Sequence, residues 1–478
     1  MSPKNKKILL VLGSGVIALI MAVAIVSRIF DINSYRPRIE AAAFEATGLE
    51  LKIRGEIVIS FFPFGIAAGD IHILNKGSEI VSLESLKLGA ELMPLLKKQI
   101  LITSCVLIRP AITLAKEADG KYNFESTKKK RTKDRLKAAF NLRNIKLSEG
   151  ALIYLDRKTG VKTEVKDFNL ATDGLSVGNT SEDVIKNIDF KGSFDCKELR
   201  RKDLIIYNLK GPVKMAMGVI HLKPLTMAIF GTMAEGDVTA DKSGASTIYK
   251  IDLKVSKLDF EKLEESIGMK KVIGGKGDLS ADLTIKVKPN RNMISSTDGT
   301  FSLRGDNLTI YTLDLDKLLT SYETSQKFNL VDIGAFFIAG PLSTVALKGY
   351  RYGDLYSKTR GGSGVITKFS SHWKLKSGIA EAADCALSTS HNRVALKGKL
   401  NLVDKRYENV TVALLDDKGC AKFKQDISGP FRRPSIGAVR AVGSLAGPIF
   451  NLFRQAGKIM MGGKCEVFYD GSVQQPSR

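Results

Sequence analysis

The hydrophobic pattern of the chain begins with an uninterrupted apolar run from Ile8 to Val26 that contains no charged residue. At about 1.5 Å per residue, a helix over this run would be roughly 28 Å long, which is close to the ~30 Å hydrocarbon core of a bilayer. The run therefore predicts a single transmembrane anchor. The residues that we assign to the anchor are Ile8, Leu12, Ile17, Ile20 and Val26.

The flanks of this run indicate its orientation and leave two alternatives. Lys4, Lys6 and Lys7 precede it, which favours a cytoplasmic N-terminus and a body on the other side of the membrane. Ala22-Val23-Ala24 has the form of a signal-peptide cleavage site, but apolar residues continue beyond it. Gly13 to Ala18 matches a dinucleotide-binding motif, but the residues after it lack the polar face of a Rossmann helix.

After the anchor, the pattern predicts a helix and then a sheet. Residues 33–47 repeat apolar positions at helical spacing, and Gly48 is placed to end the helix. The period then changes to two, with a turn at Gly55. Side chains at alternate positions of a strand share one face, so this segment predicts an apolar face near the membrane end of a sheet. The candidates that line it are Leu51, Ile53, Ile57, Ile59 and Phe61.

The remaining chain is mostly a series of alternating strands with polar turns. Short helices are predicted at 91–98, 260–267 and 313–325. Residues 436–460 follow helical spacing after Pro434, and a last strand is predicted at 465–469. The 436–460 helix would either pack on the end of the sheet or lie on a membrane surface.

The one-sided strands have a physical consequence. An apolar sheet face must be covered by a second sheet, as in a sandwich, or by helices or an apolar ligand, as in a curled trough. Periodicity alone leaves both outcomes open. In either case the sequence predicts a β-rich (α+β) fold.

Charge and aromatic content bear on the class of ligand that the protein could bind. The 478 residues carry a net charge of +23, but the basic residues are spread along the strands, and the single Trp373 leaves no aromatic interleaving. Nucleic-acid binding is therefore not expected. Basic surfaces also suit anionic lipid head groups. The densest basic stretch, at 126–141, is typical of a solvated loop, and contact with anionic lipid is the alternative.

The sequence contains few residues that could form a metal site or a catalytic site. The four histidines and five cysteines show no ligand spacing, so we expect no metal and no cofactor. We find neither a nucleophile motif nor convergent acid–base residues, and we expect no enzymatic activity. An odd number of cysteines leaves a free thiol. Cys420 and Cys465 flank the predicted C-terminal helix in an oxidising compartment, and we predict that they form a disulfide.

Several short motifs behind the predicted anchor occur in a characteristic order. They are Gly48 through Gly55 to Phe61-Phe62-Pro63, then Asp70 to Asn75, Arg109 to Leu114 with Asp119 to Phe124, Ile145 to Asp156, and Ile427 to Pro434. In this order they resemble the AsmA family of membrane-anchored bacterial envelope proteins. The resemblance covers the first 170 or so residues well and the last 180 moderately.

The resemblance implies an elongated, curled antiparallel β-sheet groove with short helices behind the N-terminal transmembrane helix. It implies an inner-membrane protein with a periplasmic body that binds phospholipid or another acyl lipid and transfers it during outer-membrane biogenesis. The alternative is a non-enzymatic scaffold that contacts outer-membrane assembly factors through its sheet edges. We divide the chain into an anchor with its Lys-rich stub, an AsmA-like helix and sheet, the basic loop, a central sheet body and a C-terminal AsmA-like domain: 1–30, 31–125, 126–141, 142–300 and 301–478.

Overall fold

The chain forms two compact units in a computed structural model, unit 1 (Met1–Met217) and unit 2 (Gly218–Arg478). Each unit is described by itself. The structure describes residues 32–91, 93–94, 101–125, 140–177, 184–202, 204–266, 271–287, 292–311, 314–317, 319, 362–442 and 467–476.

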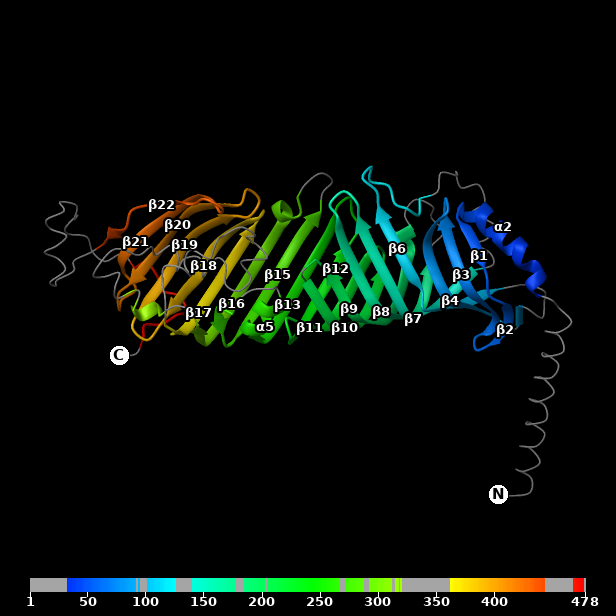
Figure 1. Ribbon diagram of the computed structural model, residues 1–478, viewed down its shortest axis with the longest axis horizontal. Coiled ribbons are helices and arrows are strands. Elements are labelled where there is room, and N and C mark those ends of the chain that lie inside the picture. Colours follow the sequence, from blue (N-terminus) through cyan, green and yellow to red (C-terminus); the bar gives the residue numbers. More distant parts are fainter. Residues whose placement is uncertain are drawn as a thin grey trace, which may run out of the picture. The chain divides into compact units, whose positions relative to one another are not determined.

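Unit 1 begins with η1 (Ile32–Tyr35) and α2 (Arg36–Thr47), which accompany the first strands of a sheet (Figure 1). The helix predicted at 33–47 is thus confirmed, and Gly48 ends it in the left-handed conformation, with φ 73°. The strands of unit 1 are β1 (Glu50–Ile53), β2 (Ile57–Phe61), β3 (Phe64–Asn75), β4 (Ser78–Ala90), β5 (Ile102–Ile108), β6 (Ala111–Lys116), β7 (Phe140–Asp156), β8 (Val161–Val177), β9 (Ile188–Arg201) and β10 (Leu204–Ala216), with η2 (Val184–Asn187) before β9.

Unit 1 corrects one part of the predicted topology, because its sheet is mixed. β5 and β6 both run parallel to β7, whereas neighbouring pairs such as β3 with β4 and β7 with β8 are antiparallel. A parallel pair needs a connection longer than a hairpin. The segment predicted as a basic loop at 126–141 lies between β6 and β7, except that its last two residues already belong to β7, which begins at Phe140. Since β7 joins the strands before it, this segment does not separate two sheets.

The first edge of the unit 1 sheet is hydrogen-bonded to the helical segment beside it. Asn33 accepts from the backbone N–H of Ile57 (2.9 Å) and donates to its carbonyl (3.4 Å). Glu40 accepts from the N–H of Ile53 (2.8 Å), and Arg36 donates to the carbonyl of Gly55 (2.7 Å). These side chains satisfy backbone groups that an exposed edge strand would leave free.

Unit 2 is an antiparallel sheet in which most sequential strands pair as neighbours, although β13 pairs with β15 and β14 with β16. Tight turns make this possible: Phe230 and Gly231 both have positive φ, as the two-residue turn between β11 and β12 requires. The elements are β11 (Val219–Ile229), β12 (Thr232–Asp241), β13 (Thr247–Asp259), α5 (Phe260–Ser266), β14 (Ile273–Gly274), β15 (Lys276–Val287), η3 (Ile294–Ser296), β16 (Thr297–Ile310), β17 (Gly364–Lys376), β18 (Ile379–Ser388), β19 (Arg393–Asn401), β20 (Arg406–Leu415), β21 (Ala421–Pro430), β22 (Ser435–Ile436) and β23 (Arg440–Ala441).

Short helices cover parts of the unit 2 sheet. α5 confirms the helix predicted at 260–267, and Phe260 and Leu263 are buried. Its Glu264 carboxylate accepts the backbone N–H of Val272 (2.8 Å) and of Ile273 (3.2 Å), which fixes the helix to the strand that follows. Burial raises the pKa of Glu264 to about 7.

The C-terminal segment differs from its prediction. The helix predicted from 436 is wrong at its start, because β22 and β23 pair with β21 there. Of the last strand predicted at 465–469, the described residues 467–469 contain one isolated bridge, between Val467 and Cys420. The chain then crosses the outside of the sheet, where Phe468, Tyr469 and Val473 bury the small residues Ala386, Ala395 and Ala413. These alanines pair with one another on the neighbouring strands β18, β19 and β20, and their small side chains leave room for the tail.

Several predictions lie wholly or partly outside the described residues. They are the anchor at 8–26, most of the basic loop, most of the helices at 91–98 and 313–325, and residues 443–466. Within the described ranges, no helix has both the length and the apolar character needed to cross a bilayer.

Ile57 and Val58 give a direct test of the core of unit 1. Ile57 is 3% exposed, whereas its neighbour Val58 points to the other face and is exposed. Ile57→Asp buries a charge and should lower the free energy of unfolding by about 3–5 kcal/mol. Val58→Asp should cost less than about 1 kcal/mol.

The two variants are compared with the parent chain by chemical denaturation of the full-length protein. Equal losses of stability in both variants would show that this strand is not packed on one face only.

Candidate functional site

The first row of the apolar face runs across the unit 1 sheet. Paired residues on neighbouring strands share a face, so the strand registers trace rows of side chains from strand to strand. One row crosses from β2 to β9 and contains Ile57, Ala68, Leu86, Leu107, Leu147, Leu170 and Phe194.

A second row crosses the same sheet closer to its other margin. It contains Leu51, Ile73, Val81, Ile112, Leu152, Val165, Leu199 and Ile206. Leu51 and Val81 from this row contact the same core cluster as Leu86 and Leu107 from the first row. Both rows therefore lie on one face, which we call the apolar face.

The opposite face has a different composition. Its corresponding row contains Val58, Ala67, Lys87, Val106, Lys146, Ala171, Ser193 and Pro212. Most of these residues are exposed. Unit 1 thus has one apolar face and one face that is largely polar or small, as the alternating pattern predicted.

The apolar face is only partly covered by the described part of unit 1. Near β1 to β4, Ile32 and Ile39 from η1 and α2 pack against the buried residues Ile53 and Ile57. Farther across the sheet, Leu147 is buried, but most apolar side chains of the two rows are half-buried. They include Leu152, Val165, Leu170, Phe194 and Leu199. In a closed sandwich, an opposing sheet would bury these side chains.

Unit 2 contains a comparable row of side chains that is completely buried. Its central row contains Met227, Ala234, Val255, Leu279, Leu303, Ser371, Cys385, Leu396 and Val412. Every one of these side chains is buried. The half-buried state of the unit 1 rows is therefore not a general property of sheet faces in this protein.

Left-handed residues keep the apolar rows on one face where strict alternation would fail. Glu149 has φ 55°, and the register between β7 and β8 shifts around it. As a result, Leu147 and Leu152 lie on the same face although an odd number of positions separates them. Asp70 and Arg109 have the same conformation between other members of the rows. Such bulges also bend a strand.

The structure places the five predicted lining residues in two environments. Ile53 and Ile57 belong to the buried core beneath α2, with Leu51 partly buried beside them. Ile59 is half-buried, and Phe61 is exposed. All five follow the apolar face by register. The uncovered part of that face, from Ile112 to Leu199, was missed because its bulges break the simple alternation.

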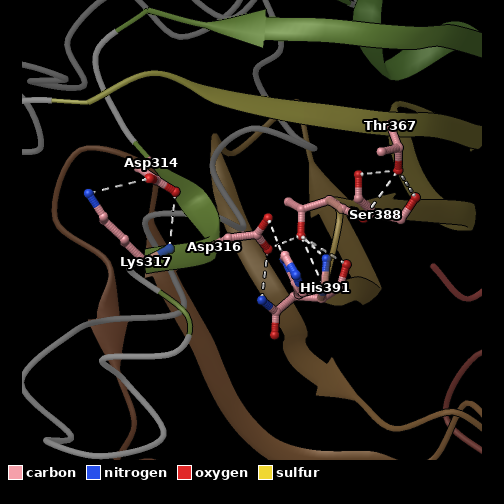
Figure 2. Close-up of polar contacts among 8 residues, drawn as sticks. Asp314, Asp316, Lys317, Thr367, Ser388 and His391 are labelled. Atoms are coloured by element: carbon pink, nitrogen blue, oxygen red, sulfur yellow. Dashed lines mark hydrogen bonds and ion pairs between the residues drawn. The ribbon is translucent and has the colours of Figure 1, made fainter. Parts of the chain in front are cut away.

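A separate polar cluster lies in unit 2, where a short helical turn meets the turn between β18 and β19 (Figure 2). Asp316 accepts hydrogen bonds from the Thr389 hydroxyl and from the Asn392 amide (2.9 Å), and lies 3.3 Å from His391. Burial alone would raise the pKa of Asp316, but these hydrogen bonds together hold its pKa below the ordinary value. With its oxygens engaged in this way, the carboxylate docks the helical turn onto the hairpin.

Unit 2 has a charged hollow of about 360 Å³. Lys257, Lys276, Arg304 and Lys368 line it together with Asp278 and Asp306. Across the described ranges, no group of three or more histidine, cysteine or carboxylate side chains could hold a metal ion.

The cysteines are mostly thiols. Cys420 is disulfide-bonded. Its predicted partner, Cys465, lies outside the described residues, so this pairing stays a prediction. Burial raises the pKa of Cys385 to about 12, so that thiol is protonated and unreactive at neutral pH. The free cysteines are Cys105, Cys196 and Cys385.

Comparison with known proteins places the chain in one family. The model of the AsmA family matches residues 3–202 and 175–385, which together span most of the chain. No curated protein and no solved structure was found to match it.

Removal of the Asp316 carboxylate should loosen the helical turn in unit 2. Asp316→Ala removes the acceptor of the Asn392 amide and one of the two acceptors of the Thr389 hydroxyl, and should cost about 1–3 kcal/mol. Because the folded pKa of Asp316 is depressed, the parent should have this stabilisation above the unfolded pKa and lose it as the pH falls through the folded value.

The measurement is the free energy of unfolding between pH 3 and 7. Lys317→Ala is the control, because the Lys317 side chain is exposed and its ion pair with Asp314 is long, at 4.0 Å. The control should change stability by less than about 1 kcal/mol. A loss in Asp316→Ala that is no greater than in this control would contradict the docking role.

Proposed function

The chain belongs to the AsmA family, and on that premise we propose that it is a lipid-binding and lipid-transfer protein of the bacterial envelope. We further propose that residues 8–26 anchor it in the inner membrane, with the body in the periplasm, and that it carries phospholipid during outer-membrane biogenesis. Family membership supports the general role in the envelope. The lipid class, the location and the transfer rest on the arguments that follow.

The observation that carries the proposal is the uncovered part of the apolar face in unit 1. Half-buried leucine, valine and phenylalanine side chains there continue rows that are buried beneath α2. An extended apolar surface of this kind on a water-soluble body marks a binding site for something apolar. The first row crosses seven strands and the second row crosses eight, and neither row contains a charged residue.

An acyl chain fits this surface energetically. Each buried CH₂ contributes roughly 0.8 kcal/mol, so a chain of about sixteen carbons would gain on the order of 10 kcal/mol before the cost of ordering it. The head group would remain in water beyond the margin of the face. Transfer along such a surface needs no catalytic residue, because the lipid is moved and not chemically changed.

The scaffold alternative requires a free strand edge for a client to join. At the first edge of unit 1, the N–H of Ile53 and both backbone groups of Ile57 already bond to Glu40 and Asn33. A client strand could pair there only by displacing these side chains. This geometry favours lipid binding over edge-strand binding for this part of the molecule.

Adjacent residues on β7 test the proposal. Leu152 lies on the apolar face, whereas Ile153 faces the other way and pairs with Thr113 and Glu164. Both side chains are half-buried, so the same substitution at the two sites perturbs folding similarly. Leu152→Asp should lower the amount of bound phospholipid at least about tenfold, since a charge on the face opposes an acyl chain.

The full-length protein is purified in parallel from cells, and its bound lipid is quantified by mass spectrometry. Ile153→Asp, the matched control, should retain the parent's lipid. Equal lipid content in both variants and the parent, or no phospholipid on the parent, would overturn lipid binding at the apolar face.

A further inference from the structure

The hairpin between β2 and β3 has an exposed aromatic tip. Phe62 is 90% exposed, and Phe61 beside it is 47% exposed. Val58 and Ile66 on the two strands are exposed as well. Such a concentration of large apolar side chains at one projecting turn costs solubility and indicates a contact surface.

The turn between β2 and β3 is held in place by its contacts with the sheet. Phe61 pairs with Phe64 to close the hairpin. A Cβ on Gly89 would lie 2.6 Å from Pro63, which shows that the turn rests closely against β4. Beyond the end of β4, Met93 adds a further apolar side chain that is 75% exposed. The exposed tip is therefore part of a well-defined end of the sheet.

This end of the sheet lies near the point where the chain enters unit 1. Asn33 in η1 bonds to Ile57 at the start of β2, and β2 runs from there to the tip. Only a few residues separate the apolar run ending at Val26 from η1. At no more than about 3.6 Å per residue, this link keeps η1 within roughly 20 Å of the end of that run.

We propose that the tip of the β2–β3 hairpin, Phe61 to Phe64 with Met93, inserts into the interfacial layer of a lipid bilayer. The bilayer is the one that residues 8–26 span, so the inference rests on the anchor in the proposed function. Aromatic side chains on a short projecting turn suit this layer, because they bury apolar surface at head-group depth. A neutral turn with no acidic residue meets an anionic surface without repulsion.

The insertion would join the bilayer to the apolar face. Phe61 and Phe64 form the first pair at the tip, followed by Ile59, Ile66 and Leu88 in the next row. The row after that is the first row of the apolar face, which begins at Ile57. An acyl chain could therefore pass from the bilayer onto the sheet over apolar side chains, without crossing open water.

A fluorescence experiment on the full-length chain tests this contact. Phe62→Trp places an indole at the tip, where the side chain makes few contacts, and the parent with its buried Trp373 supplies the background signal. The protein is reconstituted in phospholipid vesicles whose acyl chains are brominated near the carbonyl end. We expect the added fluorescence of Phe62→Trp to be lost in these vesicles relative to unbrominated ones.

Met233→Trp is the matched control, because Met233 is 63% exposed and lies at the β11–β12 turn in unit 2. Its added fluorescence should be unchanged by bromination. An indole at position 62 that is no more quenched than the one at position 233 would overturn the insertion, as would failure of the chain to associate with the vesicles.

A second variant measures the consequence for lipid uptake. Phe62→Ser should slow loading of fluorescent phospholipid from vesicles by about tenfold, the factor expected for losing one apolar anchor from the layer. Met233→Ser should load at the parent's rate. Equal rates for the two variants would contradict the entry role of the tip.

The outcomes separate this inference from the proposed function. Quenching at position 62 in a protein that binds no phospholipid on Leu152 and its row would preserve the membrane contact and remove the lipid-binding function. Lipid binding with no quenching would do the reverse.

Discussion

The whole structure depends on how a one-sided sheet covers its apolar face. Hydrogen bonding assembles the strands, but it leaves the face as a surface that water penalises by roughly 25 cal/mol per Å². In unit 1, η1 and α2 cover only the part that lies over Ile53 and Ile57. The stability of unit 1 therefore depends on this covered region, and its capacity to bind an apolar ligand depends on the region beyond it.

The apolar face of unit 1 stays continuous across strands that change register. Strict alternation would turn the face over wherever a strand changes register, and one charged residue in the row would interrupt an apolar path. Left-handed positions such as Glu149 absorb the change, so that Leu147 and Leu152 remain on one side. Arg109 also serves this purpose, and its side chain bonds to Glu84 and Glu149. Polar side chains are thus used at the bulges, away from the apolar face.

The sequence predicted the local elements of unit 1 well where one period held over many residues. The helix ending at Gly48 and the strands around Gly55 follow directly from spacing and turn chemistry. It failed where partners are distant in the chain: nothing local indicated that β5 and β6 run parallel to β7, or that the residues after Pro434 pair with β21. At the start of the predicted 436–460 helix, strand pairing with β21 therefore prevailed over the local helical spacing.

The candidate site, too, was predicted only in part from the sequence. Period-two alternation correctly identified an apolar face at Leu51 to Phe61, but it could not say which members are sealed, because α2 covers Ile53 and Ile57 and leaves Phe61 exposed. Burial is decided by what lies opposite a strand, and that information is not local.

The covering of the apolar face also distinguishes the two units. In unit 2, the row through Val255, Leu303 and Val412 is buried. A row like this stabilises its own unit and offers no surface to a ligand. The rows of unit 1 are only half-buried, so they stabilise their unit less. A bound acyl chain would bury them and would thereby stabilise the folded state of unit 1.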